Sequence, residues 1–279
     1  MQIARTLPEL RAALAGRQRP AFVPTMGNLH DGHIALVRQA RPLADTLVAS
    51  IFVNRLQFLP HEDFDSYPRT WDADCARLEA ADCDIVFAPR ERDLYPEPQT
   101  FKIQPDPALA DILEGQFRPG FFTGVCTVVM KLFQAVFATT GGGTAVFGQK
   151  DYQQLMVIRH MVQQFALPIE IIGCATARAD SGLALSSRNS YLSDEQRVQA
   201  MALSQALKAL ADAARLGGNL ADLEAQAMAA LRAKGWEPDY LSVRQRSDLQ
   251  APADARSGDL VALGAARLGS TRLIDNLEF

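Results

Sequence analysis

Two histidines three residues apart, His30 and His33, lie between a predicted strand and a predicted helix. The same turn contains Gly27 and Gly32, which allow the backbone to approach a phosphate group closely. The N-terminus of a helix favours an anion, and imidazole N–H groups can donate hydrogen bonds to a phosphorus transition state. Two surface histidines or a pair of metal ligands would share this spacing. The position between strand and helix favours phosphate chemistry.

Two neutral amides, Asn54 and Gln57, follow the second predicted strand, at residues 47–53. Neutral amides can orient a small polar substrate without adding a charge. Taken alone, this segment is better interpreted as turn residues that cap a loop.

A lysine precedes the helix predicted at residues 152–165. Lys150 can neutralise a phosphate group at this helix start, and Gln154 lies one turn further along. The alternative interpretation makes Asp151 a simple carboxylate at the helix N-terminus and Lys150 a solvated charge.

A fourth polar segment, residues 183–189, follows the last predicted strand of the first half of the chain. Gly182 and the two serines predict a mobile loop. The hydroxyl and N–H groups of Ser186 and Ser187, with the guanidinium of Arg188, can bind the β- and γ-phosphates of a nucleotide. An ordinary linker would rarely need this sequence between apolar residues, so a functional interpretation is favoured.

Strands alternate with helices over about the first 175 residues. This order predicts a parallel sheet with right-handed crossovers, an α/β, Rossmann-like doubly wound fold. Such folds bind ligands at the carboxyl ends of their strands. The predicted strands are residues 21–25, 47–53, 84–87, 144–147 and 169–175, and the predicted helices are residues 34–41, 71–81, 152–165 and an apolar stripe at residues 125–136.

The rest of the chain predicts a smaller α+β domain with an antiparallel sheet. Ala-rich helices are expected at residues 194–215 and 220–234, and short strands at residues 240–244, 260–263 and 272–274. We therefore expect two domains, residues 1–176 and 177–279.

The formal charge of −4 over 279 residues argues against a general binder of nucleic acids or of anionic membranes. The four cysteines form no C-x-x-C pair, which indicates reduced thiols and a cytoplasmic protein. The N-terminus has no apolar signal-peptide core. The most apolar stretch, residues 121–138, contains Lys131 and Gln134, so we expect no membrane span.

The histidine turn resembles the HIGH signature of nucleotidyltransferases and class I aminoacyl-tRNA synthetases, and the Ser186–Arg188 loop resembles their KMSKS loop by position. Together, in this order and spacing, the four segments resemble the pantoate–β-alanine ligase family. Further matches are Tyr-Pro-Arg-Thr at residues 67–70 and the runs at residues 124–133 and 269–276. The resemblance covers essentially the whole chain.

The resemblance implies a two-step reaction with ATP and Mg²⁺. The carboxylate of pantoate attacks the α-phosphate of ATP to give pantoyl adenylate, and β-alanine then displaces AMP to give pantothenate. A cytidylyltransferase-type enzyme of the same superfamily and an inactive nucleotide-binding scaffold remain as alternatives. The resemblance also implies a cytoplasmic homodimer, with residues 1–176 binding nucleotide and pantoate and residues 177–279 forming a lid.

The resemblance also assigns individual residues. It makes His33 the proton donor, with His30, Lys150 and Arg188 as the other catalytic groups. It places pantoate on Gln57 and Gln154, β-alanine on Gln57 and Asn54, and Mg²⁺ near Asp74 through water, and it places Arg118 close to the site. The residues implied to bind ATP are Met26, Gly27, Asn28, Leu29, His30, Asp31, Gly32, His33, Gly148, Gln149, Lys150, Asp151, Ala177, Leu185, Ser186, Ser187 and Arg188.

The chain departs from the family pattern at several positions. Arg55 stands where proline is common, Gln149 where glutamate is common, Phe121 where histidine is common and Ser181 where aspartate is common. Ala73 stands where the family usually has a second acid. None of these removes a group assigned to the chemistry, so they bear on rate and affinity more than on reaction type.

Overall fold

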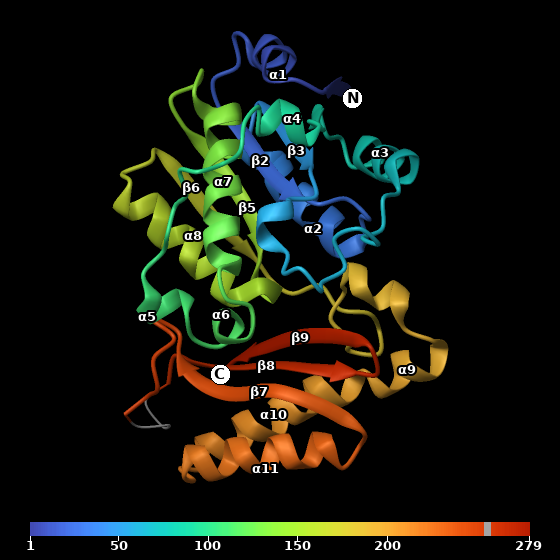
Figure 1. Cartoon of the computed structure of the whole chain (residues 1–279), viewed down its shortest axis with the longest axis vertical. Coiled ribbons are helices and arrows are strands. Elements are labelled where there is room, and N and C mark those ends of the chain that lie inside the picture. The colour runs from blue at the N-terminus through green and yellow to red at the C-terminus, as the bar shows by residue number, and fades with distance from the viewer. Residues whose placement is uncertain (254–257) are drawn as a thin grey trace.

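The computed structural model describes residues 1–253 and 258–279. Within these residues the strands form two sheets, one of six strands and one of three (Figure 1). We call the larger sheet with its helices, residues 1–174, the larger unit, and residues 194–279 the smaller unit. The two units lie one above the other in Figure 1.

The strands of the larger sheet are all parallel and lie in the order β1, β4, β3, β2, β5, β6. They are β1 (Gln2–Ala4), β2 (Pro20–Thr25), β3 (Thr46–Ile51), β4 (Ile85–Phe87), β5 (Gly143–Gly148) and β6 (Ile169–Cys174). From β2 the chain runs outward to β3 and β4, and it then returns to the other side of β2 to form β5 and β6. The predicted doubly wound sheet is confirmed, and its switch point lies between β2 and β5.

Neighbouring residues of one strand belong to different cores. In β2, the side chain of Phe22 joins one apolar cluster, and those of Ala21 and Val23 join the other. Val48 of β3 and Phe147 of β5 lie in the cluster of Phe22. This two-residue period is the geometry of a strand that is buried on both faces.

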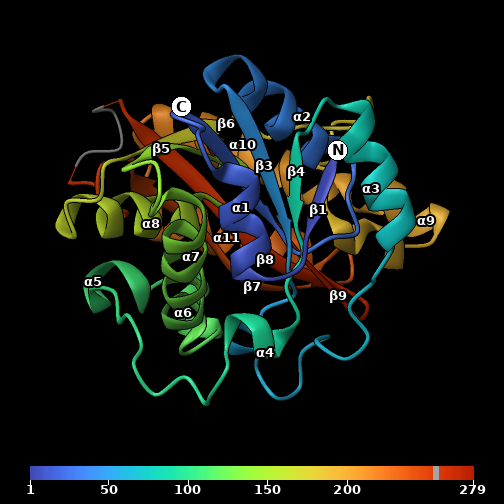
Figure 2. The ribbon, with the colours of Figure 1, turned by 90° about the horizontal axis from the view of Figure 1, so that it is seen from above.

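Helices cover both faces of the larger sheet (Figure 2). On the Phe22 side lie α1 (Leu7–Leu14), α7 (Phe121–Phe137) and α8 (Tyr152–Gln164). On the other side lie α2 (Asp31–Ala40) and α3 (Trp71–Ala80). The connection from β4 to α7 contains the short helices α4 (Glu91–Leu94), α5 (Pro107–Ala110) and α6 (Glu114–Phe117).

The smaller sheet is antiparallel, as predicted, and consists of β7 (Trp236–Gln245), β8 (Leu260–Leu268) and β9 (Thr271–Glu278). Helices α9 (Asp194–Gln199), α10 (Met201–Arg215) and α11 (Leu220–Arg232) precede it. Leu203 and Leu207 of α10 share a core with Leu241 of β7, whereas Val261 and Leu263 of β8 join the core of the larger unit. The smaller sheet therefore lies between the larger unit and helices α10 and α11 (Figure 1).

The predicted elements are present, with several differences in their bounds and number. The expected helix at residues 194–215 is interrupted at Ala200, which separates α9, with no buried residue, from α10, which buries an apolar face. Strand β3 ends at Ile51, since its partner β2 ends opposite at Thr25. Strand β1 and helix α1 were not predicted, because β1 is short and exposes Gln2 and Ile3.

The predicted domain boundary falls in the segment between β6 and the 3₁₀ helix Ser187–Tyr191. The division into two domains stays a prediction. Cys83, Cys126 and Cys174 are buried, Cys75 is half-buried, and all are free thiols. Among the described residues, no helix is both long enough and apolar enough to cross a membrane.

Candidate active site

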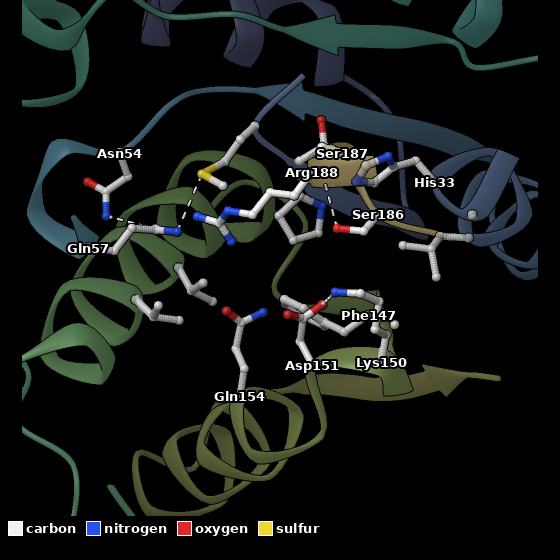
Figure 3. Close-up of a pocket in the computed structure, with 18 of the residues that line it drawn as sticks. His33, Asn54, Gln57, Phe147, Lys150, Asp151, Gln154, Ser186, Ser187 and Arg188 are labelled. Atoms are coloured by element: carbon white, nitrogen blue, oxygen red, sulfur yellow. Dashed lines mark hydrogen bonds and ion pairs between the residues drawn. The ribbon is translucent and has the colours of Figure 1, made fainter. Parts of the chain in front are cut away.

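A cavity opens at the carboxyl ends of β2, β3 and β5, beside the switch point of the larger sheet (Figure 3). The loop after β2, the residues after β3, the turn after β5 and the segment after β6 all contribute to its wall. A second, smaller cavity shares Arg118, Lys150 and Arg188 with it and extends between the two units. The four polar segments noted in the sequence therefore meet at one place.

The loop after β2 is held in shape by one buried carboxylate. Gly27 has a φ of +84°, in the left-handed region that favours glycine. Asp74 of α3 accepts the backbone N–H groups of Asn28 at 2.9 Å and Leu29 at 2.7 Å, and it accepts the hydroxyl of Thr70 at 3.1 Å. Asp74 is 1% exposed. It therefore fixes the turn that leads into α2.

The two histidines are positioned by backbone N–H groups at the start of α2. Nδ1 of His30 accepts the N–H of Gly32 at 3.1 Å, and Nδ1 of His33 accepts the N–H of His30 at 3.3 Å. A neutral imidazole whose Nδ1 is an acceptor carries its proton on Nε2. The two rings lie 4.0 Å apart between centroids, and both residues line the cavity.

Both histidines are neutral at pH 7. Burial, followed by the charge of Lys150, lowers the pKa of His30 to about 4. Burial, followed by the neighbouring His30 and Lys150, lowers the pKa of His33 to about 3. Each histidine therefore offers an Nε2–H hydrogen-bond donor without bringing a charge.

Lys150 lies in the 3₁₀ helix Gln149–Asp151, which joins β5 to α8. Asn276 of β9 donates from Nδ2 to the carbonyl oxygens of Gln149 and Lys150, both at 2.9 Å, so the smaller unit holds this turn in place. The ammonium of Lys150 lies 3.8 Å from a carboxylate oxygen of Asp151. Both side chains and that of Gln154 point into the cavity (Figure 3).

The Ser186–Arg188 segment closes the side of the cavity opposite Lys150 (Figure 3). The hydroxyl of Ser186 accepts the N–H of Arg188 at 3.3 Å and begins a 3₁₀ helix. Ser187 contacts the first loop, because its hydroxyl donates to the carbonyl oxygen of Asn28 at 3.3 Å. The guanidinium of Arg188 is paired with Asp63 at 3.0 Å. Arg188 is thus placed beside the cavity by a carboxylate that a phosphate can replace.

The two amides after β3 have different surroundings. Nδ2 of Asn54 donates to the carbonyl oxygen of Gly124 at 3.2 Å and to Oε1 of Gln57 at 3.1 Å, and its Oδ1 accepts the hydroxyl of Tyr95 at 2.9 Å. Asn54 is 1% exposed. Its side chain is therefore used to orient Gln57, whose Nε2 lies 3.4 Å from the sulfur of Met26. The assignment of Asn54 to β-alanine stays a prediction.

Helix α7 supplies one apolar side of the wall. The cavity is lined there by Phe121, Val125, Val128, Val129 and Leu132. This surface limits the water that can enter beside the polar groups.

Two of the family departures are explained by contacts with arginine. The guanidinium of Arg118 lies 3.8 Å from the ring centroid of Phe121. Arg55 stacks on the ring of Phe64 at 3.9 Å and lies 3.6 Å from Glu91. Arg55 therefore faces the neighbouring loop rather than the cavity.

Most of the predicted site residues lie on the cavity wall, and some lie behind it. On the wall are Met26, His30, Gly32, His33, Asn54, Gln57, Gly148, Lys150, Asp151, Gln154, Ala177, Leu185, Ser186, Ser187 and Arg188. Behind it are Gly27, Asn28, Leu29, Asp31, Asp74 and Gln149. Asp31 is paired with Arg77 at 2.9 Å on the outer surface, and Leu29 is buried in the core. Gln149 contributes a carbonyl oxygen to the contact with Asn276.

The predicted contact of Asp74 with Mg²⁺ through water stays a prediction. Its carboxylate is buried against backbone N–H groups rather than directed into the cavity, so its oxygens are used within the protein. In the described part of the chain, no three His, Cys, Asp or Glu side chains are grouped closely enough to hold a metal ion. A divalent ion at this site would rely on phosphate oxygens and water, which is the usual mode of Mg²⁺ bound with a nucleotide.

Several residues of the site could not be found from the sequence. Asp63 and Glu62 pair with Arg188 and Arg118, and Glu114 joins the same group of charges. These acidic residues lie on loops with no local motif. Only the resemblance indicated Arg118 itself, and its partners are set by chain segments distant in sequence.

The comparisons with known proteins agree over the whole chain. The family model described as pantoate-beta-alanine ligase matches residues 2–278. The pantothenate synthetase of Paracidovorax citrulli is 71% identical over 283 residues, which cover 100% of both chains.

Two solved structures are similar in fold as well as in sequence. The crystal structure of pantothenate synthetase from Thermus thermophilus has a TM-score of 0.92 at 44% identity and covers 100% of this chain and 99% of that chain. The structure of pantoate-beta-alanine ligase from Francisella tularensis, complexed with beta-gamma ATP and beta-alanine, has a TM-score of 0.83 at 34% identity. It covers 100% of this chain and 97% of that chain.

Proposed function

The chain belongs to the pantoate–β-alanine ligase family, and we propose that its cavity joins (R)-pantoate to β-alanine through a pantoyl-adenylate intermediate. One observation carries the assignment of the cavity. Two neutral imidazole donors, Lys150 and Arg188 meet at the switch point of the sheet, beside the amide of Gln57. The cationic and neutral donors suit the phosphates of a nucleotide. The neutral amide of Gln57 suits a small polar acid bound next to it.

ATP binds with its phosphates between the start of α2 and the turn that carries Lys150. The N-terminus of α2 and the Nε2–H groups of His30 and His33 face the α-phosphate. Lys150 and Arg188 neutralise the phosphates, and phosphate oxygens replace Asp63 on the guanidinium of Arg188.

In the first half-reaction, a carboxylate oxygen of pantoate attacks the α-phosphorus of ATP. An oxygen–phosphorus bond forms, the bond from the α-phosphorus to its bridging oxygen breaks, and pyrophosphate leaves with that electron pair. The carboxylate needs no general base, since it is already ionised at pH 7. The protein contributes orientation by Gln57 and Gln154 and hydrogen-bond donors for the charge that develops on phosphorus.

In the second half-reaction, the neutral amine of β-alanine attacks the acyl carbon of the adenylate. A carbon–nitrogen bond forms, the bond from the acyl carbon to the phosphate oxygen breaks, AMP leaves, and the nitrogen releases one proton. The apolar wall of α7 protects the mixed anhydride from water.

The resemblance implies that Mg²⁺ would be bound together with ATP. Mg²⁺ supplies charge neutralisation on the phosphates. Asp151 is the carboxylate that the described residues place on the wall of this cavity, beside Lys150. The ion would therefore be held mainly by phosphate oxygens and water, with Asp151 as the protein carboxylate on the wall.

We expect the enzyme to act as a homodimer in the cytoplasm. The dimer rests on the family resemblance, and the compartment rests on the free, mostly buried thiols. The mass of the purified protein, measured by light scattering, checks the dimer.

The function is tested with purified protein, ATP, Mg²⁺ and D-pantoate, with and without β-alanine, with AMP and pantothenate followed by mass spectrometry. We expect AMP to form in a one-to-one ratio with pantothenate when β-alanine is present. A nucleotidylated product in place of AMP would support the cytidylyltransferase alternative. ATP binding without pyrophosphate release would support the inactive scaffold.

A further inference from the structure

Five charged side chains of alternating sign connect the smaller unit to the loop after β3. Asp239 of β7 accepts Nε of Arg272 at 2.7 Å, and both Nη atoms of Arg272 contact Glu114 at 2.8 Å. Glu114 lies 3.3 Å from Nη1 of Arg118, and Arg118 makes a two-pronged contact with Glu62 at 2.6 and 2.8 Å. We call these residues the charge chain. It crosses from β9 of the smaller unit to α6 of the larger unit.

The charge chain contacts the backbone of Gln57, a residue that the proposed site assigns to substrate binding. Nη2 of Arg118 donates to the carbonyl oxygen of Gln57 at 3.0 Å. Glu114 and Arg118 are each 8% exposed, and the guanidinium is also stacked on Phe121. Because its donors are used by Glu62, Glu114 and Gln57, Arg118 is suited to hold the backbone of Gln57 rather than to bind substrate.

We propose that Arg118 is a positioning residue for Gln57, and that Arg272 of the smaller unit sets the placement of Arg118 through Glu114. The inference deepens the proposed function, on which it rests for the assignment of Gln57 to pantoate and β-alanine. The smaller unit then helps to position Gln57, on the side of the cavity where pantoate and β-alanine would bind, as well as the turn that carries Lys150. The geometry of Gln57 depends on the docking of the two units.

A neutral, isosteric change at the middle of the charge chain separates positioning from simple stabilisation. In Glu114→Gln, Arg118 keeps Glu62 and Arg272 keeps Asp239, so neither buried guanidinium loses its only carboxylate. The variant is therefore expected to fold. What weakens is the link between the two arginines.

Glu278→Gln is the matched control. Glu278 lies on β9, as does Arg272, the partner of Glu114, and it contacts the larger unit by accepting the hydroxyl of Tyr152 at 2.8 Å. This substitution removes the same charge from an inter-unit contact that does not lead to Arg118.

The first readout compares KM values in the ligase assay. We expect Glu114→Gln to raise KM for pantoate and β-alanine about 10-fold, a typical coupling between residues of one network, and KM for ATP by less than about 3-fold. Glu278→Gln should change all three by less than about 2-fold. An equal rise in all three KM values in Glu114→Gln would indicate general loosening and overturn the inference.

The second readout is a double-mutant cycle with Gln57→Ala. If Glu114 acts through Gln57, then Glu114→Gln has little further effect on KM for pantoate once the Gln57 side chain is absent. If the two substitutions raise KM for pantoate independently, so that their fold-changes multiply in the double variant, Glu114 does not act through Gln57.

The third readout does not depend on activity. The N–H groups of Gln57 and Phe58 donate to the carbonyl oxygens of Asn54 and Arg55, so amide hydrogen exchange in this segment reports its order. We expect exchange at residues 54–62 to become about 10-fold faster in Glu114→Gln and to stay unchanged in Glu278→Gln. Unchanged exchange in Glu114→Gln overturns the positioning role even if the wild-type protein makes no pantothenate, an outcome that would refute only the proposed function.

Discussion

Replacing Asp74 with asparagine distinguishes a carboxylate that holds a loop from one that holds a metal ion. In the structure, both carboxylate oxygens accept hydrogen bonds from the protein, at 2.9 Å from the N–H of Asn28 and at 2.7 Å from the N–H of Leu29. An asparagine retains one carbonyl oxygen, and its NH₂ group must face one of these backbone N–H groups. One buried donor therefore loses its acceptor.

The magnitude follows from this loss. A hydrogen bond to a charged acceptor contributes roughly 1.5–3 kcal/mol, and an unsatisfied buried donor costs about 1–3 kcal/mol. Since these contributions overlap, we expect Asp74→Asn to lower the free energy of unfolding by about 2–4 kcal/mol. The loop also carries His30 and His33, so kcat should fall by about 10-fold or more as their donors move.

The assay combines urea unfolding with a titration of Mg²⁺ at fixed ATP in the ligase reaction. Asp72→Asn is the control, because Asp72 lies in the same first turn of α3 but is exposed. It should lose no more than about 1 kcal/mol, the usual contribution of a carboxylate to the helix dipole. Unchanged stability of Asp74→Asn together with a higher Mg²⁺ requirement would refute the loop-holding role and support a contact with the metal ion.

Three further predictions concern the wall of the cavity. His33→Ala should lower kcat by about 100-fold or more, because it removes a donor placed for the phosphorus transition state; near wild-type turnover by a folded variant would remove His33 from the mechanism. The free energy of unfolding should fall as the pH is lowered from about 6.5 to about 4, because the unfolded chain protonates its histidines near 6.5 whereas His30 and His33 stay neutral until about 4 and about 3. Urea unfolding at several pH values across this range checks the sign of the change. The loss of unfolding free energy per pH unit should be smaller in His33→Ala. Gly124→Ala should raise KM for pantoate and β-alanine about 10-fold, because a Cβ at Gly124 collides with the carbonyl oxygen of Leu56 next to Gln57. If the Gly124→Ala variant is folded and active and its KM values are unchanged, the close contact between Gly124 and Leu56 does not position Gln57.

Local patterns were enough to predict the doubly wound sheet and the four polar segments that meet at the cavity. Each of Ala21, Phe22 and Val23 is apolar, a pattern typical of a strand buried on both faces, and helical periods lie between such strands. Parallel strands bring their carboxyl ends to one edge, so the polar residues that follow them must meet there. Local order therefore predicted that His33 and Lys150 lie at one site, and both line the same cavity.

The pairing of the charged side chains could not be predicted from the sequence. Asp74 and Leu29 are 45 residues apart, and Arg272 and Glu114 are 158 residues apart. No local period relates such positions, because their contact depends on how α3 packs beside the first loop and how β9 docks on α6. The resemblance implied a contact of Asp74 with Mg²⁺ through water, and only the fold shows that the same carboxylate holds the loop after β2. An aspartate that holds a loop and one that contacts a metal ion are the same residue type in the sequence. The groups that surround the carboxylate in space determine what it binds.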